Sequence, residues 1–278
     1  KDGNVGAAGT ATSVAGIPFY SADNSIYTHD VSGTDSTASF NTAYGLTAMD
    51  AITTGDRNTA IGYGAGGALT VATDCVFVGR QAGVATTEGT NSTFVGSDAG
   101  GAVTTGLRNT MIGAAGWQFD TESDNMGIGH NALAGAVAGG EYNVAIGNYA
   151  LDALTSADYN TAIGYNAGTA ITTGAKNTIL GAEAGEALLS TPLNVIIGYA
   201  AGKASTTGAY NTIVGGSASQ DGVLTGNYNA IYGFESGFNL TSGTRNVLMA
   251  GKGAGYSLTS GSDNTFIGYE AGDSHDAE

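Results

Sequence analysis

The sequence is poor in the residues on which disulfides and metal sites depend. Its 278 residues include one cysteine, Cys75, together with 3 histidines and 2 prolines. A single cysteine excludes an intrachain disulfide. The histidines, His29, His130 and His275, lie far apart in the chain and are not expected to share a metal ion. We therefore expect no metal centre, no cofactor and no enzyme activity.

Basic residues are also scarce. Lys and Arg total 8 against 24 Asp and Glu, so the formal net charge is −16. Nucleic-acid binding depends on basic side chains that neutralise phosphates, so this composition disfavours it. No apolar run of 18 residues is present, and we expect no membrane insertion. The acidity fits a soluble protein in an exterior location.

Glycine, in contrast, is abundant, with 47 residues, and the chain is repetitive. A pentad of the form Asn-Thr-x-Ile-Gly recurs with a period of 17 residues, apart from one step of 16 and three of 18. Such a period is the signature of a stacked repeat array. The fifteen coils begin at Asn24, Asn41, Asn58, Cys75, Ser92, Asn109, Asn125, Asn143, Asn160, Asn177, Asn194, Asn211, Asn229, Asn246 and Asn264.

The composition of one coil predicts β structure. We number its positions 1 to 17 from the coil start. Thr, Val and Ile favour two short β segments, and Gly at positions 5, 9 and 15 favours turns with positive φ. No window has a helical apolar period, so we expect an all-β parallel β-solenoid. We expect a lead-in or capping segment at residues 1–23, the repeat array at 24–272 and a polar tail at 273–278.

The asparagine at position 1 is expected to form a ladder. Identical side chains on stacked coils lie about 4.8 Å apart, close enough for one amide to bond to the next. The expected ladder consists of Asn41, Asn58, Asn109, Asn125, Asn143, Asn160, Asn177, Asn194, Asn211, Asn229, Asn246 and Asn264.

Positions 3 and 4 are both apolar, which leads to a prediction about assembly. Position 4, as in Ile61 and Ile163, is expected to face the interior. Position 3, as in Phe77 and Ile196, would then point outward. Strands that are apolar on both faces are typically buried on both faces. We therefore expect another copy of the chain to cover position 3.

Three blocks of the repeat carry a resemblance to known fibres. Residues 58–62, 143–147 and 160–164 read Asn-Thr-Ala-Ile-Gly or Asn-Val-Ala-Ile-Gly, and each is followed by x-x-Ala. They resemble the head repeats of trimeric autotransporter adhesins and, more closely, the related repeats of bacteriophage tail fibres. The resemblance covers residues 24 to about 272. The adhesin repeat is shorter, so no ligand-binding residue is carried over.

The resemblance implies a left-handed β-roll, a homotrimeric fibre and an attachment role. The expected partners are other fibre or tail proteins and a glycan or protein on the host cell surface. The expected location is a virion tail fibre or a cell surface. A cellular trimeric adhesin or an extracellular filament subunit is the alternative.

Departures from the repeat are the places where we expect a binding site, because regular coils are occupied by stacking. Aromatic rings stack on sugars, but they also fill gaps between subunits, and both interpretations stay open. The candidates are Trp117 and Phe119 in the coil of 16 residues, and Tyr228, Tyr232, Phe234 and Phe238 near the coil that begins at Asn229.

Other functions fit parts of the pattern. Thr-Thr pairs such as Thr172 and Thr173 are typical of ice-binding solenoids, but the column is interrupted. Carboxylates on adjacent coils occur in some solenoid glycosidases, which would make the chain a glycan-depolymerising tailspike. Acidic turn residues such as Asp74 and Asp263 offer oxygen ligands for Ca²⁺ between coils, without a Ca²⁺-loop motif. We expect a structural attachment protein over each of these.

Overall fold

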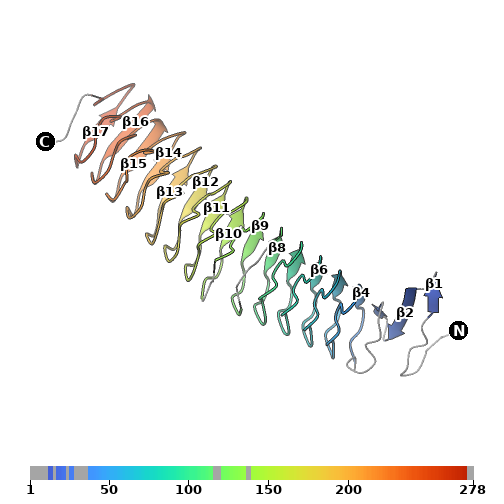
Figure 1. The fold of residues 1–278 in the computed structure, drawn as a ribbon. Helices are drawn as coiled ribbons and strands as arrows, with labels where there is room; N and C mark the ends of the chain where they lie inside the picture. Colours follow the sequence, from blue (N-terminus) through green and yellow to red (C-terminus); the bar gives the residue numbers. More distant parts are fainter. Residues whose placement is uncertain are drawn as a thin grey trace. The chain divides into compact units, whose positions relative to one another are not determined.

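The computed structural model describes residues 12–14, 17–22, 25–27, 37–114, 120–135 and 139–273. Every regular element in these residues is a β-strand, and none is a helix. The chain divides into two compact units, residues 1–126 and 127–278, and Figure 1 shows the strands of each unit side by side. The parallel strands make a β-solenoid of about 13 turns. The predicted all-β parallel solenoid is confirmed.

Each unit has its own set of strands. The first contains β1 (Thr12–Val14), β2 (Ile17–Ala22), β3 (Ser25–Tyr27), β4 (Thr42–Tyr44), β5 (Thr59–Ile61), β6 (Val76–Val78), β7 (Thr93–Val95) and β8 (Thr110–Ile112). The second contains β10 (Val144–Ile146), β11 (Thr161–Ile163), β12 (Thr178–Leu180), β13 (Val195–Ile197), β14 (Thr212–Val214), β15 (Ala230–Phe234), β16 (Val247–Lys252) and β17 (Thr265–Ile267), and β9 (Met126–Ile128) lies at the division.

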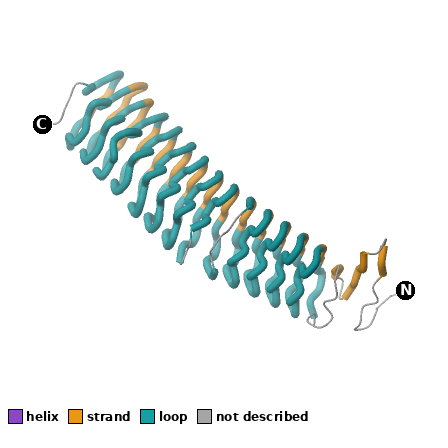
Figure 2. The backbone as a smooth tube through the Cα atoms, viewed as in Figure 1, coloured by secondary structure: helices purple, strands orange, loops and turns teal. Residues whose placement is uncertain are grey.

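A regular coil contributes one three-residue strand at positions 2 to 4, and turns make up the rest of the coil (Figure 2). The second β segment expected in each coil is not a strand in the described coils. Its backbone is still bound to the next coil, because the N–H of Thr155 donates to the oxygen of Thr172 at 2.9 Å. The strands pair in register, with Ala145 of β10 opposite Ala162 of β11.

The first described coil begins one residue later than the sequence indicates. Ile26 of β3 pairs with Thr42, so position 1 is Ser25. The Oγ of Ser25 accepts the N–H of Asn41 at 2.8 Å. Asn24 lies outside the described residues. Before this coil, β1 and β2 are antiparallel, and β2 pairs antiparallel with β3, so it covers the open edge of that strand.

The expected orientation of positions 3 and 4 is wrong. Position 3 is fully buried, as at Phe77 and Ile196, whereas position 4 faces outward, as at Ile61 and Leu180. Strand residues alternate between faces, so the buried Asn at position 1 puts position 3 inside and positions 2 and 4 outside. The interior of the coils comes from position 3, from Ala at position 8 and from the apolar residue at position 12. In the second unit it includes Ala145, Ala150, Leu154, Ala162, Ala167, Ile171, Ile179, Ala184, Leu188, Ile196, Ala201, Ile213, Ala218, Leu224, Ile231, Leu240, Leu248, Ala254 and Leu258.

Positions 3 and 9 share the volume of this core. Where position 3 is Phe77, position 9 is Gly83, and a Cβ on that glycine would lie 2.9 Å from the Phe77 ring. Where position 3 is the small Ala43, position 9 is the buried Met49. Where both positions are small, as at Ala162 and Gly168, a neighbouring coil fills the space, because a Cβ on Gly168 would lie 2.9 Å from Ile179.

Glycine has two different roles at the corners. At position 5 the backbone is left-handed, as at Gly164 with φ of 143°, and a Cβ there would lie 2.4 Å from the oxygen of Gly181. At position 15 the expectation of positive φ is wrong. Gly174 is not in that region; it is required because a Cβ would lie 2.5 Å from the oxygen of Thr191 in the next coil.

Two further positions of each regular coil are left-handed without glycine. Position 7 includes Asn166 with φ of 54° and Glu183 with φ of 59°, and position 17 includes Tyr159 with φ of 59° and Lys176 with φ of 62°. Such a conformation costs of order 1 kcal/mol for an ordinary L-residue. The hydrogen bonds to adjacent coils hold it, as when the N–H of Lys176 donates to the oxygen of Asp158 at 2.9 Å.

Candidate functional site

The asparagines of position 1 form a buried column of hydrogen bonds in each unit. In the second unit the Oδ1 of Asn160 accepts the backbone N–H of Asn177 at 2.9 Å and its Nδ2 at 3.1 Å. Asn177 makes the same pair of bonds to Asn194, at 2.9 and 3.2 Å. Each side chain thus satisfies a buried backbone donor of the next coil. This arrangement uses the polar groups of the asparagines and leaves them without a role in ligand binding.

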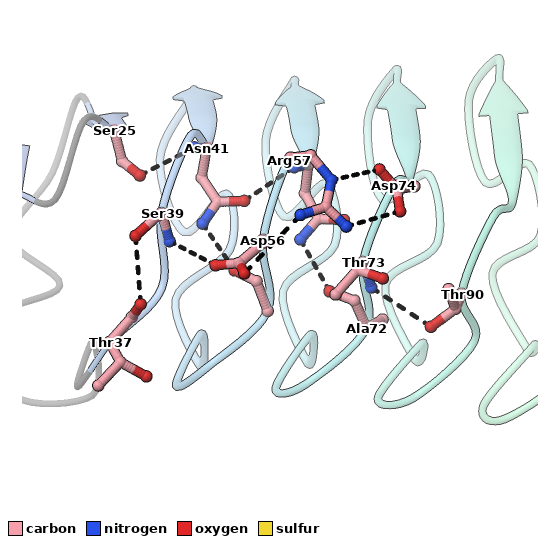
Figure 3. A network of polar contacts seen from close by, with 12 residues as sticks. Ser25, Thr37, Ser39, Asn41, Asp56, Arg57, Ala72, Thr73, Asp74 and Thr90 are labelled. Carbon is pink, nitrogen blue, oxygen red and sulfur yellow. Dashed lines mark hydrogen bonds and ion pairs between the residues drawn. The ribbon is translucent and has the colours of Figure 1, made fainter.

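In the first unit the column makes similar bonds, which Figure 3 shows around Asn41. Its Oδ1 accepts the N–H of Asn58 at 2.8 Å, and its Nδ2 donates to the oxygen of Gly55 at 2.8 Å. Cys75 and Ser92, which replace Asn in two coils of this unit, substitute for it in different ways. The Oγ of Ser92 accepts the N–H of Asn109 at 3.3 Å, whereas the Sγ of Cys75 donates to the oxygen of Gly89 at 3.0 Å.

Cys75 is a free, buried thiol. Burial raises the pKa of this thiol from 9.0 to about 11. The thiolate is the reactive form of cysteine, so this environment suppresses nucleophilic chemistry at neutral pH. His130, the one histidine within the described residues, contacts Tyr149 edge to face at 5.4 Å and lies in a different unit.

Acidic residues of the turns form ion pairs with arginines of neighbouring coils. Arg57 forms a two-pronged ion pair with Asp74, at 2.7 and 2.9 Å (Figure 3), and Arg245 forms one with Asp263 at 2.6 Å. The hydrogen bond from each arginine lowers the pKa of Asp74 and of Asp263. In the described part of the chain, no group of three or more Asp, Glu, His or Cys side chains is arranged to hold a metal ion.

The threonines of position 13 also bond to protein. The Oγ1 of Thr70 donates to the oxygen of Thr87 at 3.1 Å, and that of Thr155 donates to the oxygen of Thr172 at 3.0 Å. A threonine array that binds ice needs hydroxyls aligned toward water. This column instead uses its hydroxyls to join coils.

The outer face of the strands is an apolar surface in each unit. It is formed by positions 2 and 4, and position 4 is apolar on every strand of the second unit. On β12 the Leu180 side chain is 44% exposed, and Met249 of β16 is 43% exposed. Exposed aromatic residues of position 6 follow these strands in sequence: Tyr165, Tyr199 and Tyr269.

The structure separates the candidate aromatic residues. Trp117 and Phe119 lie outside the described residues. Tyr228 is the last residue of its 18-residue coil and stacks on Tyr210, with ring centroids 4.9 Å apart. Tyr232 and Phe234 belong to β15, beside an irregularity in its pairing with β16, and both are exposed. Phe238 follows this strand.

Phe238 belongs to a different position of the coil, position 10. It stacks on Tyr256 of the next coil, with centroids 5.0 Å apart and planes within 7°. No ring contact of the described residues joins Phe238 to Tyr228, Tyr232 or Phe234. The described ring contacts therefore do not join the four aromatic residues near the coil at Asn229 into one cluster.

The structure also contains an open groove of about 540 Å³, which we did not expect from the sequence. Two of its lining residues, Asn239 and Ser257, directly follow Phe238 and Tyr256 in the chain. The sequence does contain a signal for it. Position 11 is alanine in eight coils, and in the last coils of the second unit it becomes polar. The polar residues are Asp221, Asn239 and Ser257, and all three line the groove.

The chain matches no protein-family model, and comparison with curated proteins and with solved structures found no similar protein. Among the described residues, no helix has the length and hydropathy needed to span a membrane.

Proposed function

We propose that this chain is a subunit of a trimeric attachment fibre of the bacteriophage tail-fibre kind. Its solenoid is a left-handed β-roll, three copies pack around a common axis, and the fibre presents a surface for a host receptor. The protein acts at the virion tail or at a cell surface, together with other fibre proteins. The exposed apolar face of the parallel strands is the observation that supports this proposal most directly.

Covering this face with a second copy is energetically favourable. Full burial of a Leu or Ile side chain contributes roughly 1.5–3 kcal/mol, so burying the 44% of Leu180 that is exposed contributes about 0.6–1.3 kcal/mol. Four strands of the second unit present an exposed residue at position 4, namely Leu180, Tyr232, Met249 and Ile267, and the other four present a half-buried one. The four exposed residues alone contribute roughly 3–5 kcal/mol per unit, and the half-buried residues add to this gain, which offsets part of the entropic cost of association.

The periodicity of the face favours a copy of the same chain as its cover. Adjacent parallel strands lie about 4.8 Å apart, so the outward residues recur at that spacing. A second solenoid presents the same residues at the same spacing, and the two surfaces match over many coils. A globular partner would match only locally.

The polar chemistry of the coils supports a structural role over catalysis. The Asn column, the Thr hydroxyls and the acidic residues of position 17 are hydrogen-bonded or ion-paired between coils. Groups that hold a scaffold together in this way are not available to activate a substrate. Attachment, which requires a stable surface and no reacting group, fits this arrangement.

Sedimentation of the full chain tests the trimer. We expect a species of three times the 27.4 kDa chain mass. Leu180→Glu places a charge on the outer strand face and should shift the species toward monomer. Leu189→Glu is the matched control, because Leu189 lies in the same coil, is 42% exposed and belongs to a turn rather than to a strand. A soluble wild-type monomer, or equal dissociation by both variants, would contradict the proposal.

Attachment is tested separately with fluorescently labelled wild-type protein. We expect saturable binding to the surface of bacterial cells, reduced by unlabelled protein. Absence of saturable binding across a panel of candidate hosts would contradict the attachment role while leaving the assembly result unaffected.

A further inference from the structure

The groove in the second unit departs from the repeat in two neighbouring columns at once. Regular coils of this unit carry alanine at position 11, namely Ala153, Ala170, Ala187 and Ala204. The next three coils carry Asp221, Asn239 and Ser257 instead. The hydrogen bonds establish this alignment: the N–H of Ala204 donates to the oxygen of Gln220, that of Asp221 to Phe238, and that of Asn239 to Tyr256.

Position 10 changes in two of these three coils. It is Glu186, Lys203 and Gln220 in the coils that begin at Asn177, Asn194 and Asn211, and it becomes Phe238 and then Tyr256 in the next two coils. The two rings stack on each other and are half-buried, so part of each remains accessible. An aromatic pair therefore directly precedes two polar residues of the groove in the chain.

The groove has free hydrogen-bond acceptors. It is lined by the side chains of Asp221, Asn239, Thr241, Ser257, Thr259 and Asp273. The Asp221 carboxylate is exposed and has no hydrogen bond or ion pair within the described residues. The Nδ2 of Asn239 donates to the oxygen of Tyr256 at 3.0 Å. The Oδ1 of the same side chain takes no part in this bond and can accept one from a ligand.

The opposite end of the groove is held in place by its own contacts. The Oγ of Ser257 donates to Oδ1 of Asp273 at 3.2 Å, and the Oγ1 of Thr241 donates to the oxygen of Thr259 at 2.8 Å. These bonds fix hydroxyl and carboxylate oxygens on coils that the strand pairing holds in register. The surface is preformed, which lowers the entropic cost of binding a small polar ligand.

We propose that this groove binds a neutral saccharide. Carboxylate and amide oxygens accept the hydroxyl protons of a sugar, and the hydroxyl oxygens of Thr241 and Ser257, whose protons bond within the groove, can accept further hydrogen bonds. Its volume lies within the range of about 300–1,000 Å³ found for small-molecule sites. The rings of Phe238 and Tyr256, which precede Asn239 and Ser257 in the chain, are partly exposed but are not part of the groove lining.

The charge of the groove selects against acidic sugars. Two carboxylates line it and no Lys or Arg does so, within a chain of net charge −16. Sialic or uronic acid groups would meet like charge. The expected ligand class is therefore neutral hexose-containing glycans, and this inference rests on the proposed attachment function, for which it supplies the receptor chemistry.

A glycan array probed with the labelled full chain tests the inference. We expect binding to neutral glycans and none to sialylated or uronic glycans. The triple variant Asp221→Ala, Asn239→Ala and Ser257→Ala restores the alanine that the regular coils carry, so it should fold, and its melting temperature should fall only slightly through loss of the bonds from Asn239 to Tyr256 and from Ser257 to Asp273. Its affinity should fall by at least about tenfold, because three polar contacts are removed. Glu88→Ala, which removes an exposed carboxylate from a regular coil, is the control and should bind as the wild type does.

Several outcomes would overturn the inference. One is no binding to neutral glycans, and another is unchanged binding by the triple variant. A third is a Ca²⁺-dependent shift of the wild-type melting temperature, measured without glycan, that the triple variant loses; this result would identify a cation site instead. If the protein binds cells but no neutral glycan, this inference fails and the attachment function stands. If the protein binds a neutral glycan but remains a monomer, the proposed trimer is contradicted and the proposed saccharide site in the groove is supported.

Discussion

Replacing one asparagine of the buried column measures how much this column stabilises a coil. Asn177 is 1% exposed. Its Nδ2 donates to the Oδ1 of Asn160 at 3.1 Å and to the oxygen of Thr191 at 2.9 Å. Its Oδ1 accepts the backbone N–H and the Nδ2 of Asn194. Asn177→Ala removes all of these bonds and leaves the buried N–H of Asn194 without an acceptor.

The expected cost follows from these contacts. An orphaned buried donor costs about 1–3 kcal/mol, and each of the other lost bonds contributes about 0.5–1.5 kcal/mol. The total for Asn177→Ala is then about 2.5–7.5 kcal/mol. Asn177→Ser should cost about 1–3 kcal/mol less than alanine, because a serine Oγ can accept the next N–H. The chain itself uses this substitute where Ser92 accepts the N–H of Asn109.

Hydrogen exchange at the amide of Asn194 is the appropriate assay, because a repeat protein opens locally and a global melt averages over many coils. The amide should exchange at least about 60-fold faster in Asn177→Ala than in the wild type, and about 5- to 100-fold more slowly in Asn177→Ser than in Asn177→Ala, since each 1.4 kcal/mol corresponds to a factor of ten. Thr178→Ala, on the exposed face of the same strand, should leave this rate unchanged.

Two results would refute this reasoning. One is an unchanged exchange rate at Asn194 in the alanine variant, which would mean that water or another group replaces the lost acceptor without cost. The other is equal acceleration in the alanine and serine variants, which would mean that the acceptor oxygen is not the stabilising element.

Three other positions offer shorter tests. Gly164→Ala sets a Cβ 2.4 Å from the oxygen of Gly181 and should destabilise by about 3 kcal/mol or more, and a wild-type melting temperature would contradict this. The folded chain keeps the Cys75 proton up to a pKa of about 11, so its unfolding free energy should fall as pH rises from about 9 to about 11, relative to Cys75→Ser. Equal pH profiles would show that the thiol is not buried. Asp263→Asn breaks an exposed pair with Arg245 and should hardly change the melting temperature; a large drop would show that the pair stabilises the fold.

The repeat itself was predictable, and the orientation of its strand was also contained in the sequence. Strand residues alternate between faces, so a buried Asn177 requires a buried Ile179 and an outward Leu180. Apolar character alone could not decide this, because positions 3 and 4 are both apolar. The polar ladder fixes which face is inside, and the outer apolar surface is position 4 as a result.

Other features could not be predicted from local preference. Tyr159 and Lys176 occupy left-handed positions that their residue types disfavour, because hydrogen bonds to adjacent coils determine the backbone there. The groove depends on two columns changing together. The polar residues Asp221 and Asn239 were visible as departures from alanine, but only the stacked coils show that they line one hollow.

The equivalence of successive coils has a consequence for how such a chain evolves. Asn143 bonds to Asn160 as Asn160 bonds to Asn177, and the paired residues are separated by 17 positions in each case. Loss of residues 160–176 by recombination would bring Asn143 onto Asn177 and recreate the same contacts. The gene can therefore lengthen or shorten its product by whole modules, while the groove near its last coils is carried along unaltered.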